Sequence, residues 1–257
     1  MDRKKYIYET HLHTCEASAC GVAHGADYID YMSNLGYSGI IVTDHFFNGN
    51  SCVPKSLPWK DRVEKYQAGY LAAKKAAEGK NLSVFFGIEY NFQGDEYLIY
   101  GVDEKWLLDN PDIMTKERTE VYKRVKAYGG LMLQAHPYRE RDYLSAIRLT
   151  PTACDGIEVY NACNHPYENA LARAYAEKEG MTVLSGGSDI HHLSDDNKGG
   201  VAFDRKLESI EDFVKAMLNL EGTPVTLRDG KFTPVTEFSD ENIVSKAPSL
   251  PVIVHEK

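Results

Sequence analysis

Residues 28–45 read YIDYMSNLGYSGIIVTDH, and this stretch decides the fold because it contains a complete helix-to-strand unit. Apolar residues from Tyr28 to Leu35 recur at helical spacing, and Gly36 follows where a left-handed residue would end a helix. The apolar run Gly39–Thr43 then predicts a short strand. The stretch is therefore predicted to form one helix followed by one buried strand.

The same succession of helix, glycine and strand repeats along the chain. The predicted helices end at glycines placed as left-handed caps, which are Gly36, Gly79, Gly129, Gly180 and Gly222. The predicted strands are Tyr6–His13, Gly39–Thr43, Ser83–Glu89, Tyr97–Val102, Leu131–Ala135, Gly156–Tyr160, Thr182–Ser185 and Pro224–Leu227. Strands that alternate with helices imply a parallel α/β sheet with right-handed crossovers. About seven such units favour a closed α/β barrel, with an open doubly wound sheet as the alternative.

Composition and charge exclude several classes of protein. The chain has 257 residues, 43% of them hydrophobic, and no apolar run near the roughly 20 residues that a membrane-spanning helix needs. Its five cysteines form no C-x-x-C pair, and their odd number cannot close completely into disulfides, so a reduced, cytoplasmic protein is expected. A net charge of -9 would repel long nucleic acid, which is not an expected partner, and neither is a membrane.

The chain is expected to form a single domain, because no low-complexity stretch or flexible linker divides it. We assign the barrel to residues 1–232. Residues 233–257 hold three prolines and little periodic pattern, and they are expected to form a C-terminal tail packed on the barrel.

Residues that commonly bind metals stand where the predicted strands end. They are His11, His13, Asp44, His45, Glu89, His136, Asp189 and His191. A single histidine at a strand end is more often a hydrogen-bonded residue than a ligand, but a series at one end of successive strands is hard to obtain by chance. We therefore predict a site for borderline divalent ions at the carboxyl ends of the strands. Asp44 is expected to orient a ligand from behind rather than to bind metal itself.

The order of these motifs resembles that of the polymerase and histidinol phosphatase (PHP) family. The matching motifs are HLHT (11–14), TDH (43–45), GIE (87–89), AHPYR (135–139) and SDIH (188–191). The resemblance covers roughly residues 6–205, nearly the whole chain. It implies a single distorted, seven-stranded TIM-like barrel that performs phosphoesterase chemistry with two or three divalent ions of zinc, manganese or iron.

The resemblance also implies a role for each ligand of the first two metals. His11 and His13 would hold the first metal together with Asp189. Glu89 would bridge to a second metal, which His136 would also bind.

The third metal has a less certain set of ligands in this sequence. The resemblance assigns it to His45 and His191, and many family members add an aspartate or histidine from the segment that follows H-x-H-T. Here that segment reads CEASACGVAH (15–24), in which Glu16 or His24 could supply the ligand. We favour Glu16 because it is nearer to His13 in the sequence, and Cys20 is a third candidate, disfavoured because the other ligands are nitrogen and oxygen donors.

Two more positions bear on the site. Many family members carry a histidine in the strand after the bridging glutamate, where this chain has Tyr97, so the second metal is expected to use Glu96 or water instead, or to bind weakly. Arg139, three residues after His136, matches an arginine that could contact a substrate phosphate through its guanidinium fork. An equally plausible reading makes it a solvated arginine in a charged loop.

These residues predict hydrolysis of a phosphomonoester of a small metabolite or nucleotide. Two divalent ions can bridge a hydroxide and direct it at phosphorus, so no protein side chain is assigned as the nucleophile. The alternatives are a phosphodiesterase or exonuclease acting on short oligonucleotides, an amidohydrolase, and a metal-binding module without catalysis. Specificity would come from loops such as Phe46–Trp59 and Asn161–Asn169, which could equally be ordinary barrel loops. The sequence does not reveal the oligomeric state.

Overall fold

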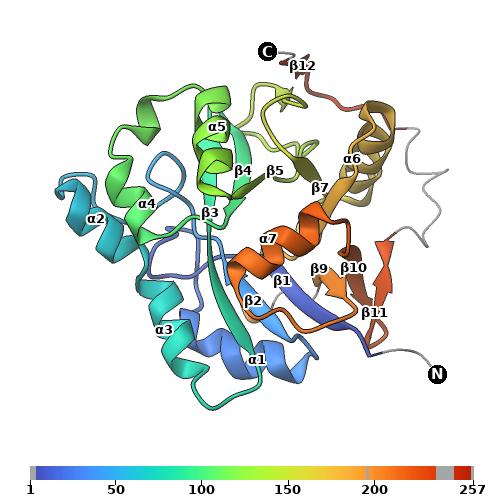
Figure 1. The fold of residues 1–257 in the computed structure, drawn as a ribbon. Coiled ribbons are helices and arrows are strands. Elements are labelled where there is room, and N and C mark those ends of the chain that lie inside the picture. Colours follow the sequence, from blue (N-terminus) through green and yellow to red (C-terminus); the bar gives the residue numbers. More distant parts are fainter. Residues whose placement is uncertain (1–3, 195–196, 236–245, 256–257) are drawn as a thin grey trace.

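The computed structural model describes residues 4–194, 197–235 and 246–255, and its main feature is a strongly curled sheet (Figure 1). In sheet order the strands are β11 (Lys231–Pro234), β10 (Thr223–Arg228), β9 (Gly199–Phe203), β1 (Tyr6–Leu12), β2 (Gly39–Val42), β3 (Ser83–Phe92), β4 (Asp95–Tyr100), β5 (Leu131–Gln134), β7 (Gly156–Asn161) and β8 (Val183–Gly187). The α-helices are α1 (Tyr28–Asn34), α2 (Trp59–Tyr66), α3 (Ala68–Ala76), α4 (Glu104–Asp109), α5 (Arg118–Tyr128), α6 (Pro166–Glu179) and α7 (Ile210–Leu218).

The sheet curls until β8 returns to β1, and this seam makes it a distorted barrel. Leu12 pairs in parallel with Ile190, just beyond β8. His13 N donates to Ile190 O at 3.0 Å, and Ile190 N donates to His11 O at 3.3 Å. Strands β1 to β5, β7 and β8 form the wall of the barrel. Strands β9 to β11 extend the sheet from β1. The predicted α/β class and barrel fold are therefore confirmed.

The sheet differs from the prediction in being mixed rather than parallel. Strand β4 pairs antiparallel with both β3 and β5, and β9 pairs antiparallel with both β1 and β10. Strands β3 and β4 form a hairpin whose two turn residues, Gln93 and Gly94, both have positive φ angles, of 56° and 99°. Positive φ at both positions is the geometry of a tight hairpin turn, so no helix separates these strands. As a result β4 begins at the end of the barrel where β3 finishes.

The helices lie on the outside of the curled sheet (Figure 1) and largely end where glycines were predicted to cap them. Gly129 ends α5 and Gly180 ends α6, with φ angles of 90° and 66° in the left-handed region. Gly222 was predicted to do the same after α7, but Leu220 takes the left-handed conformation there, with a φ of 61°. Among the described residues, no helix has both the length and the apolar character to cross a membrane.

The loop Phe46–Trp59 contributes aromatic side chains to the core, and its Asn48 lines a cavity. Phe46 and Phe47 are buried, and their rings contact those of Trp59 and Tyr66. This aromatic cluster holds the segment that follows His45 against the barrel. It therefore helps to fix the position of His45.

Two short strands connect the last part of the chain to the barrel. Strand β12 (Val252–Val254) pairs in parallel with β6 (Ile147–Leu149) as a separate two-stranded sheet. The predicted boundary between barrel and tail, at residue 232, falls inside β11. The predicted tail residues 236–245 and 256–257 lie outside the described residues.

Candidate metal centre

The ends of the strands bring the predicted ligands together at one end of the barrel. His11 and His13 lie at the end of β1, His45 follows β2, and His136 follows β5. Asp189 and His191 follow β8 across the seam. Carboxyl ends of barrel strands face the same side, so residues far apart in the sequence converge there. The groups whose donor atoms lie within 4.8 Å of one another are His11–His13–Asp189, His11–Glu89–His136, His45–Glu89–Glu96 and His13–His45–His191.

Glu89 lies at the centre of this cluster. Its Oε1 is 3.1 Å from the Nε2 atoms of both His11 and His136. Its Oε2 is 2.7 Å from His45 Nδ1 and 3.3 Å from His13 Nε2. A single carboxylate thus faces four imidazoles with its two oxygens divided between them. This is the arrangement expected of a ligand shared by two ions.

Asp189 is a second carboxylate that several imidazoles face, and it lies beyond β8, the strand next to β1 at the seam. Its Oδ1 is 3.1 Å from His13 Nε2 and 3.4 Å from His11 Nε2. The side chains of all three residues are almost completely buried. His11, His13 and Asp189 are the set predicted to hold the first metal, and the structure brings them together.

Several buried nitrogen and oxygen atoms of the cluster make no hydrogen bond. They are His11 Nε2, His13 Nε2, His45 Nδ1 and Glu89 Oε2, all of which face the interior of the cluster. Leaving a buried polar atom without a partner costs roughly 1–3 kcal/mol, so such atoms are rare in proteins. Four in one place, all of them nitrogen or oxygen donors suited to borderline divalent ions, fit a metal centre.

The electrostatics of the cluster also favour cations. Burial alone would raise the pKa of Glu89, but the facing His45 and His11 hold this pKa well below its ordinary range. The pKa of Asp189 is likewise held well below its usual value, since His11 and Arg139 outweigh its burial. Both carboxylates are therefore charged at neutral pH and available to bind cations.

A buried chain of hydrogen bonds orients His13, and it involves Asp44 as predicted. Ser18 Oγ donates to Asp44 Oδ1 at 2.6 Å and lies 3.0 Å from His13 Nδ1. Because its only hydrogen goes to Asp44, Ser18 must accept the hydrogen of His13 Nδ1, which leaves a lone pair on Nε2. Thr14 also donates to Asp44 through its N and Oγ1 atoms. Asp44 thus sets the tautomer of His13 through Ser18.

Glu158 has the same role for His11, and the sequence analysis did not identify it. Its Oε1 lies 3.1 Å from His11 Nδ1, and its Oε2 accepts hydrogen bonds from His136 N and Asn161 Nδ2. A carboxylate can only accept, so His11 donates from Nδ1 and turns a bare Nε2 toward Glu89. Glu158 lies within the apolar strand β7 (GIEVYN), where a lone charged residue was the available signal.

The backbone is strained at two of the predicted ligands. His136 has a φ angle of 26° and Asp189 one of 54°, in the region that residues other than glycine rarely adopt. Such conformations cost on the order of 1–3 kcal/mol and are concentrated at functional sites. Here they turn both side chains into the cluster directly after β5 and β8.

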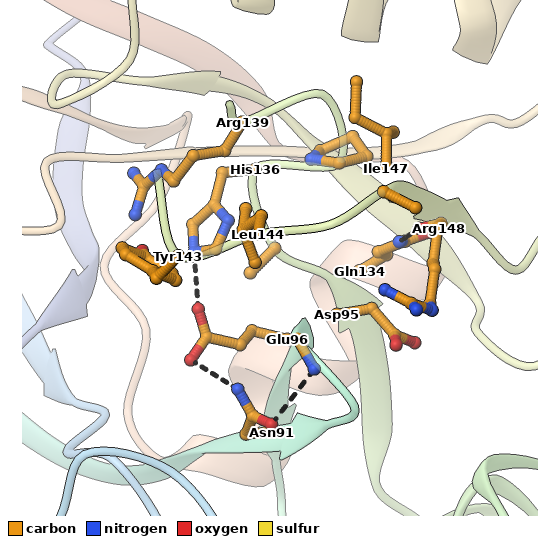
Figure 2. A pocket seen from close by; sticks show the side chains of 14 residues that line it. Asn91, Asp95, Glu96, Gln134, His136, Arg139, Tyr143, Leu144, Ile147 and Arg148 are labelled. Carbon is orange, nitrogen blue, oxygen red and sulfur yellow. Dashed lines mark hydrogen bonds and ion pairs between the residues drawn. The ribbon is translucent and has the colours of Figure 1, made fainter. Parts of the chain in front are cut away.

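Glu96 lies beside the cluster, one residue before Tyr97, the position at which the family pattern suggested a histidine. Its Oε2 is 3.5 Å from His136 Nε2, and its Oε1 accepts a hydrogen bond from Asn91 Nδ2 at 3.1 Å (Figure 2). The same Oε1 is 3.7 Å from His45 Nδ1. Glu96 reaches the cluster because the hairpin turns β4 back toward it. Tyr97 instead points away, with its hydroxyl bonded to Asp95 and Thr150.

Arg139 is held inside the site rather than in solvent. Its Nη2 lies 2.6 Å from Asp189 Oδ2 and donates to Asn161 Oδ1, while Nε donates to Asn164 Oδ1. Figure 2 shows it beside His136 at the rim of a small cavity. The solvated-loop interpretation is therefore wrong. The guanidinium group holds Asp189 in place. Its Nη1 is the nitrogen that bonds to none of Asp189, Asn161 and Asn164.

Glu16, the favoured ligand of the third metal, lies in a different group of residues. Its carboxylate accepts a hydrogen bond from Gly25 N and is 3.2 Å from His24 Nδ1. Glu16 and His24 form a group with Cys15 at the surface. The residue of this loop that reaches the histidines is Cys20, whose Sγ lies 3.1 Å from His191 Nε2. Burial raises the pKa of the Cys20 thiol, but hydrogen bonds with His191 and His45 outweigh it and lower this pKa to about 6. Nearness to His13 in sequence was a poor guide because the loop turns at Ser18–Gly21.

Comparisons with known proteins find structural likeness only. No protein-family model matches the sequence, and no curated protein matches it. A two-domain protein from Bacteroides vulgatus that contains a predicted PHP-like metal-dependent phosphoesterase superposes with a TM-score of 0.65 and 16% identity, over 86% of this chain. The chain spans 65% of that protein, which is just under two thirds of its length.

Two further solved structures are similar over most of their own lengths. An amidohydrolase from Chromobacterium violaceum, with bound sulfate and no metal, has a TM-score of 0.51 and 14% identity, covering 82% of this chain and 96% of that one. A candidate metal-dependent phosphoesterase from Bifidobacterium adolescentis has a TM-score of 0.49 and 16% identity, covering 76% and 91%. The curled sheet and the donor cluster at its end thus give this chain the fold of the PHP-like metal-dependent phosphoesterases.

Proposed function

We propose that this chain is a metal-dependent phosphoesterase that hydrolyses phosphomonoesters of a small metabolite or nucleotide. The observation that carries the proposal is Glu89, a buried carboxylate that faces four imidazoles, three of which turn a nitrogen without a hydrogen bond toward it. Such a set is suited to bind two or more ions that share one ligand.

Each part of the site has a task in this proposal. His11, His13 and Asp189 would hold one ion, His136 and Glu96 a second, and Glu89 would join the two. Divalent ions bound there would supply Lewis-acid activation of water and neutralise the charge of a phosphoryl group. Asp44 and Glu158 fix the imidazoles, so that the donor atoms need little rearrangement when ions bind.

Arg139 is the residue that we propose to contact the substrate phosphate. Two of its nitrogens are engaged by Asp189, Asn161 and Asn164, so the guanidinium group is held rigidly beside His136. Its Nη1 would be directed at a phosphoryl oxygen, where a fixed positive charge stabilises the charge that develops during transfer. The chain's net charge of -9 favours a small ester over a long nucleic acid.

Measurement of bound metal and of phosphatase turnover in the same sample tests the proposal. Mass spectrometry should find about two or three equivalents of zinc, manganese or iron, and 4-nitrophenyl phosphate should be hydrolysed in a chelator-sensitive way. Glu89→Gln should lose metal and lower turnover by at least about a hundredfold, because the shared ligand becomes neutral. Glu78→Gln, a change of the same type at an exposed position, should behave as wild type.

Two results would reject this function. Glu89→Gln with full metal content and full turnover would exclude Glu89 as the shared ligand. Hydrolysis of bis(4-nitrophenyl) phosphate or short oligonucleotides in preference to the monoester would favour the phosphodiesterase alternative. Cleavage of a polymer should weaken steeply with added salt, whereas monoester turnover should not.

A further inference from the structure

The segment Cys15–His24 contains a thiol whose position relative to the histidine cluster is built into the fold. Cys20 is half-buried, and its Sγ is 3.1 Å from His191 Nε2. The thiol also shares a hydrogen bond with His45. His13, His45 and His191 themselves place ring nitrogens within 4.8 Å of one another.

The hydrogen bond at Nδ1 of His191 makes Nε2 the nitrogen that is turned toward Cys20. His191 Nδ1 lies 2.8 Å from the main-chain oxygen of Asp189, which can only accept, so Nδ1 carries the hydrogen. In the neutral imidazole, the lone pair of Nε2 therefore faces Cys20. Zinc–sulfur and zinc–nitrogen bonds of ordinary length, set at the tetrahedral angle, separate the two donor atoms by roughly 3.5 Å. A small outward movement from the observed 3.1 Å would therefore admit an ion.

The turn that carries Cys20 is fixed by bonds to the site itself. Ala19 N donates to Asn50 O at 2.8 Å, Gly21 N donates to Ser18 O at 3.1 Å, and Val22 N donates to His191 O at 3.0 Å. Gly21 packs so closely that a Cβ atom there would lie 2.4 Å from Thr14 O. Because Ser18, in the same turn, also bonds to His13 and Asp44, the thiol and the imidazoles are held by one network.

A second observation is that buried nitrogens without hydrogen bonds lie on the histidines next to Cys20. His13 Nε2 is completely buried and His45 Nδ1 nearly so, and neither atom makes a hydrogen bond. Three imidazoles and a thiol in contact form a set of nitrogen and sulfur ligands, and such a set binds zinc in preference to magnesium or calcium.

We propose that Cys20 supplies a thiolate ligand, with His45 and His191, to a third metal ion of this site. The proposal rests on the metal-dependent function proposed above, and it changes the chemistry of the third position from oxygen or nitrogen to sulfur. On binding, the thiol proton passes to solvent and the sulfur forms a bond to the ion, with no change in oxidation state. The thiolate would make this ion the most zinc-selective of the three.

Cobalt(II) binding to the metal-free protein tests the proposal without measuring activity. Cobalt added to the reduced wild-type protein should produce a thiolate-to-cobalt charge-transfer band in the near ultraviolet in addition to its visible bands. Cys20→Ala should lose the near-ultraviolet band and bind its last equivalent at least about tenfold more weakly, while the visible bands of the other ions remain. Cys20→Asp should restore the affinity, because a carboxylate can take the place of the thiolate, but not the band.

Cys52→Ala and Cys15→Ala are the matched controls. Cys52 is an exposed free cysteine whose Sγ donates to Glu16 O, and Cys15 belongs to the surface group with Glu16 and His24. Both variants should keep the band. Its loss in Cys15→Ala would place the thiolate in the surface group and overturn the assignment to Cys20, as would a band unchanged in Cys20→Ala. Visible cobalt bands without the charge-transfer band would reject Cys20 alone, whereas failure to bind any cobalt would reject the metal-dependent function itself.

Discussion

At the scale of single residues, Arg139 is the side chain whose removal should be most informative. It is the cation that faces Asp189, and both groups are nearly buried. Removing one partner of a buried ion pair costs about 3–5 kcal/mol, so Arg139→Ala should lower the melting temperature clearly. Arg139→Lys should recover part of the stability, because it keeps the charge but cannot bond to Asp189, Asn161 and Asn164 together.

Inhibition by inorganic phosphate separates the two roles of this arginine. If Nη1 contacts the phosphoryl group, phosphate should inhibit Arg139→Lys at least about tenfold more weakly than wild type, even where the metal content is equal. Equal inhibition of both proteins at equal metal content would limit Arg139 to positioning Asp189.

Sequence reasoning at this scale identified residues that the structure brings together where a residue lies at or just after the end of a strand. His11, His13, His136 and Asp189 were predicted because the end of a barrel strand determines which side its residues face. Glu158 was not predicted, since a carboxylate inside a strand reveals its role only when its neighbour across the sheet is known. Cys20 was ranked below Glu16 because the other candidate ligands are nitrogen and oxygen donors and because Glu16 is nearer to His13 along the chain, a distance that says little about a loop that turns back on itself.

At the scale of secondary-structure elements, β8 approaches β1 so closely at Gly187 that even a methyl side chain there should disturb the packing. A Cβ atom at Gly187 would lie 2.6 Å from His11 Cβ and 2.8 Å from Glu158 Oε1. Gly187→Ala should therefore push these strands apart, cost about 1–3 kcal/mol of unfolding free energy, and weaken metal binding. Chemical denaturation and metal titration would measure the two effects.

Gly49→Ala is the control for this experiment. A Cβ atom at Gly49 would meet only ordinary contacts, of 3.4 Å or more, so the variant should match wild type in both measurements. A Gly187→Ala protein with unchanged stability and metal affinity would show that the seam is looser than its contacts indicate.

The elements themselves were predicted better than their directions. The hydrophobic pattern located β1 to β5, β7, β8 and β10, because apolar runs mark buried strands whichever way they run. It did not reveal the β3–β4 hairpin, since Gln93–Gly94 is a weaker turn signal than the Asn-Gly or Asp-Gly pairs that favour this geometry. The consequence reached the site: Glu96 enters it from the start of a strand, where a parallel arrangement would not place it.

At the scale of the whole molecule, bound metal should add considerably to stability. The cluster confines Glu89, Asp189 and several imidazoles that have unsatisfied donor atoms, and ions would compensate for them. At about a hundred times its dissociation constant, each ion contributes about 2.7 kcal/mol. At roughly 2–4 °C per kcal/mol for a protein of this size, removal of metal by a chelator should lower the melting temperature by at least about 5 °C.

Calorimetry with and without chelator measures this effect, and readdition of zinc should reverse it. Glu89→Gln serves as the reference, because its melting temperature should respond much less to either treatment. A wild-type melting temperature that does not change on chelation would show that the cluster is stable without ions.

The seam between Leu12 and Ile190 also sets an order of events during synthesis. The candidate metal centre begins with His11 and His13 at the first strand, and its last members, Asp189 and His191, emerge only after almost the entire barrel has been translated. Contacts between segments so distant in the chain form late, because a very long loop must close first. A nascent chain that has not yet reached Asp189 therefore lacks the set His11, His13 and Asp189, so we expect this part of the site to form only when the barrel closes.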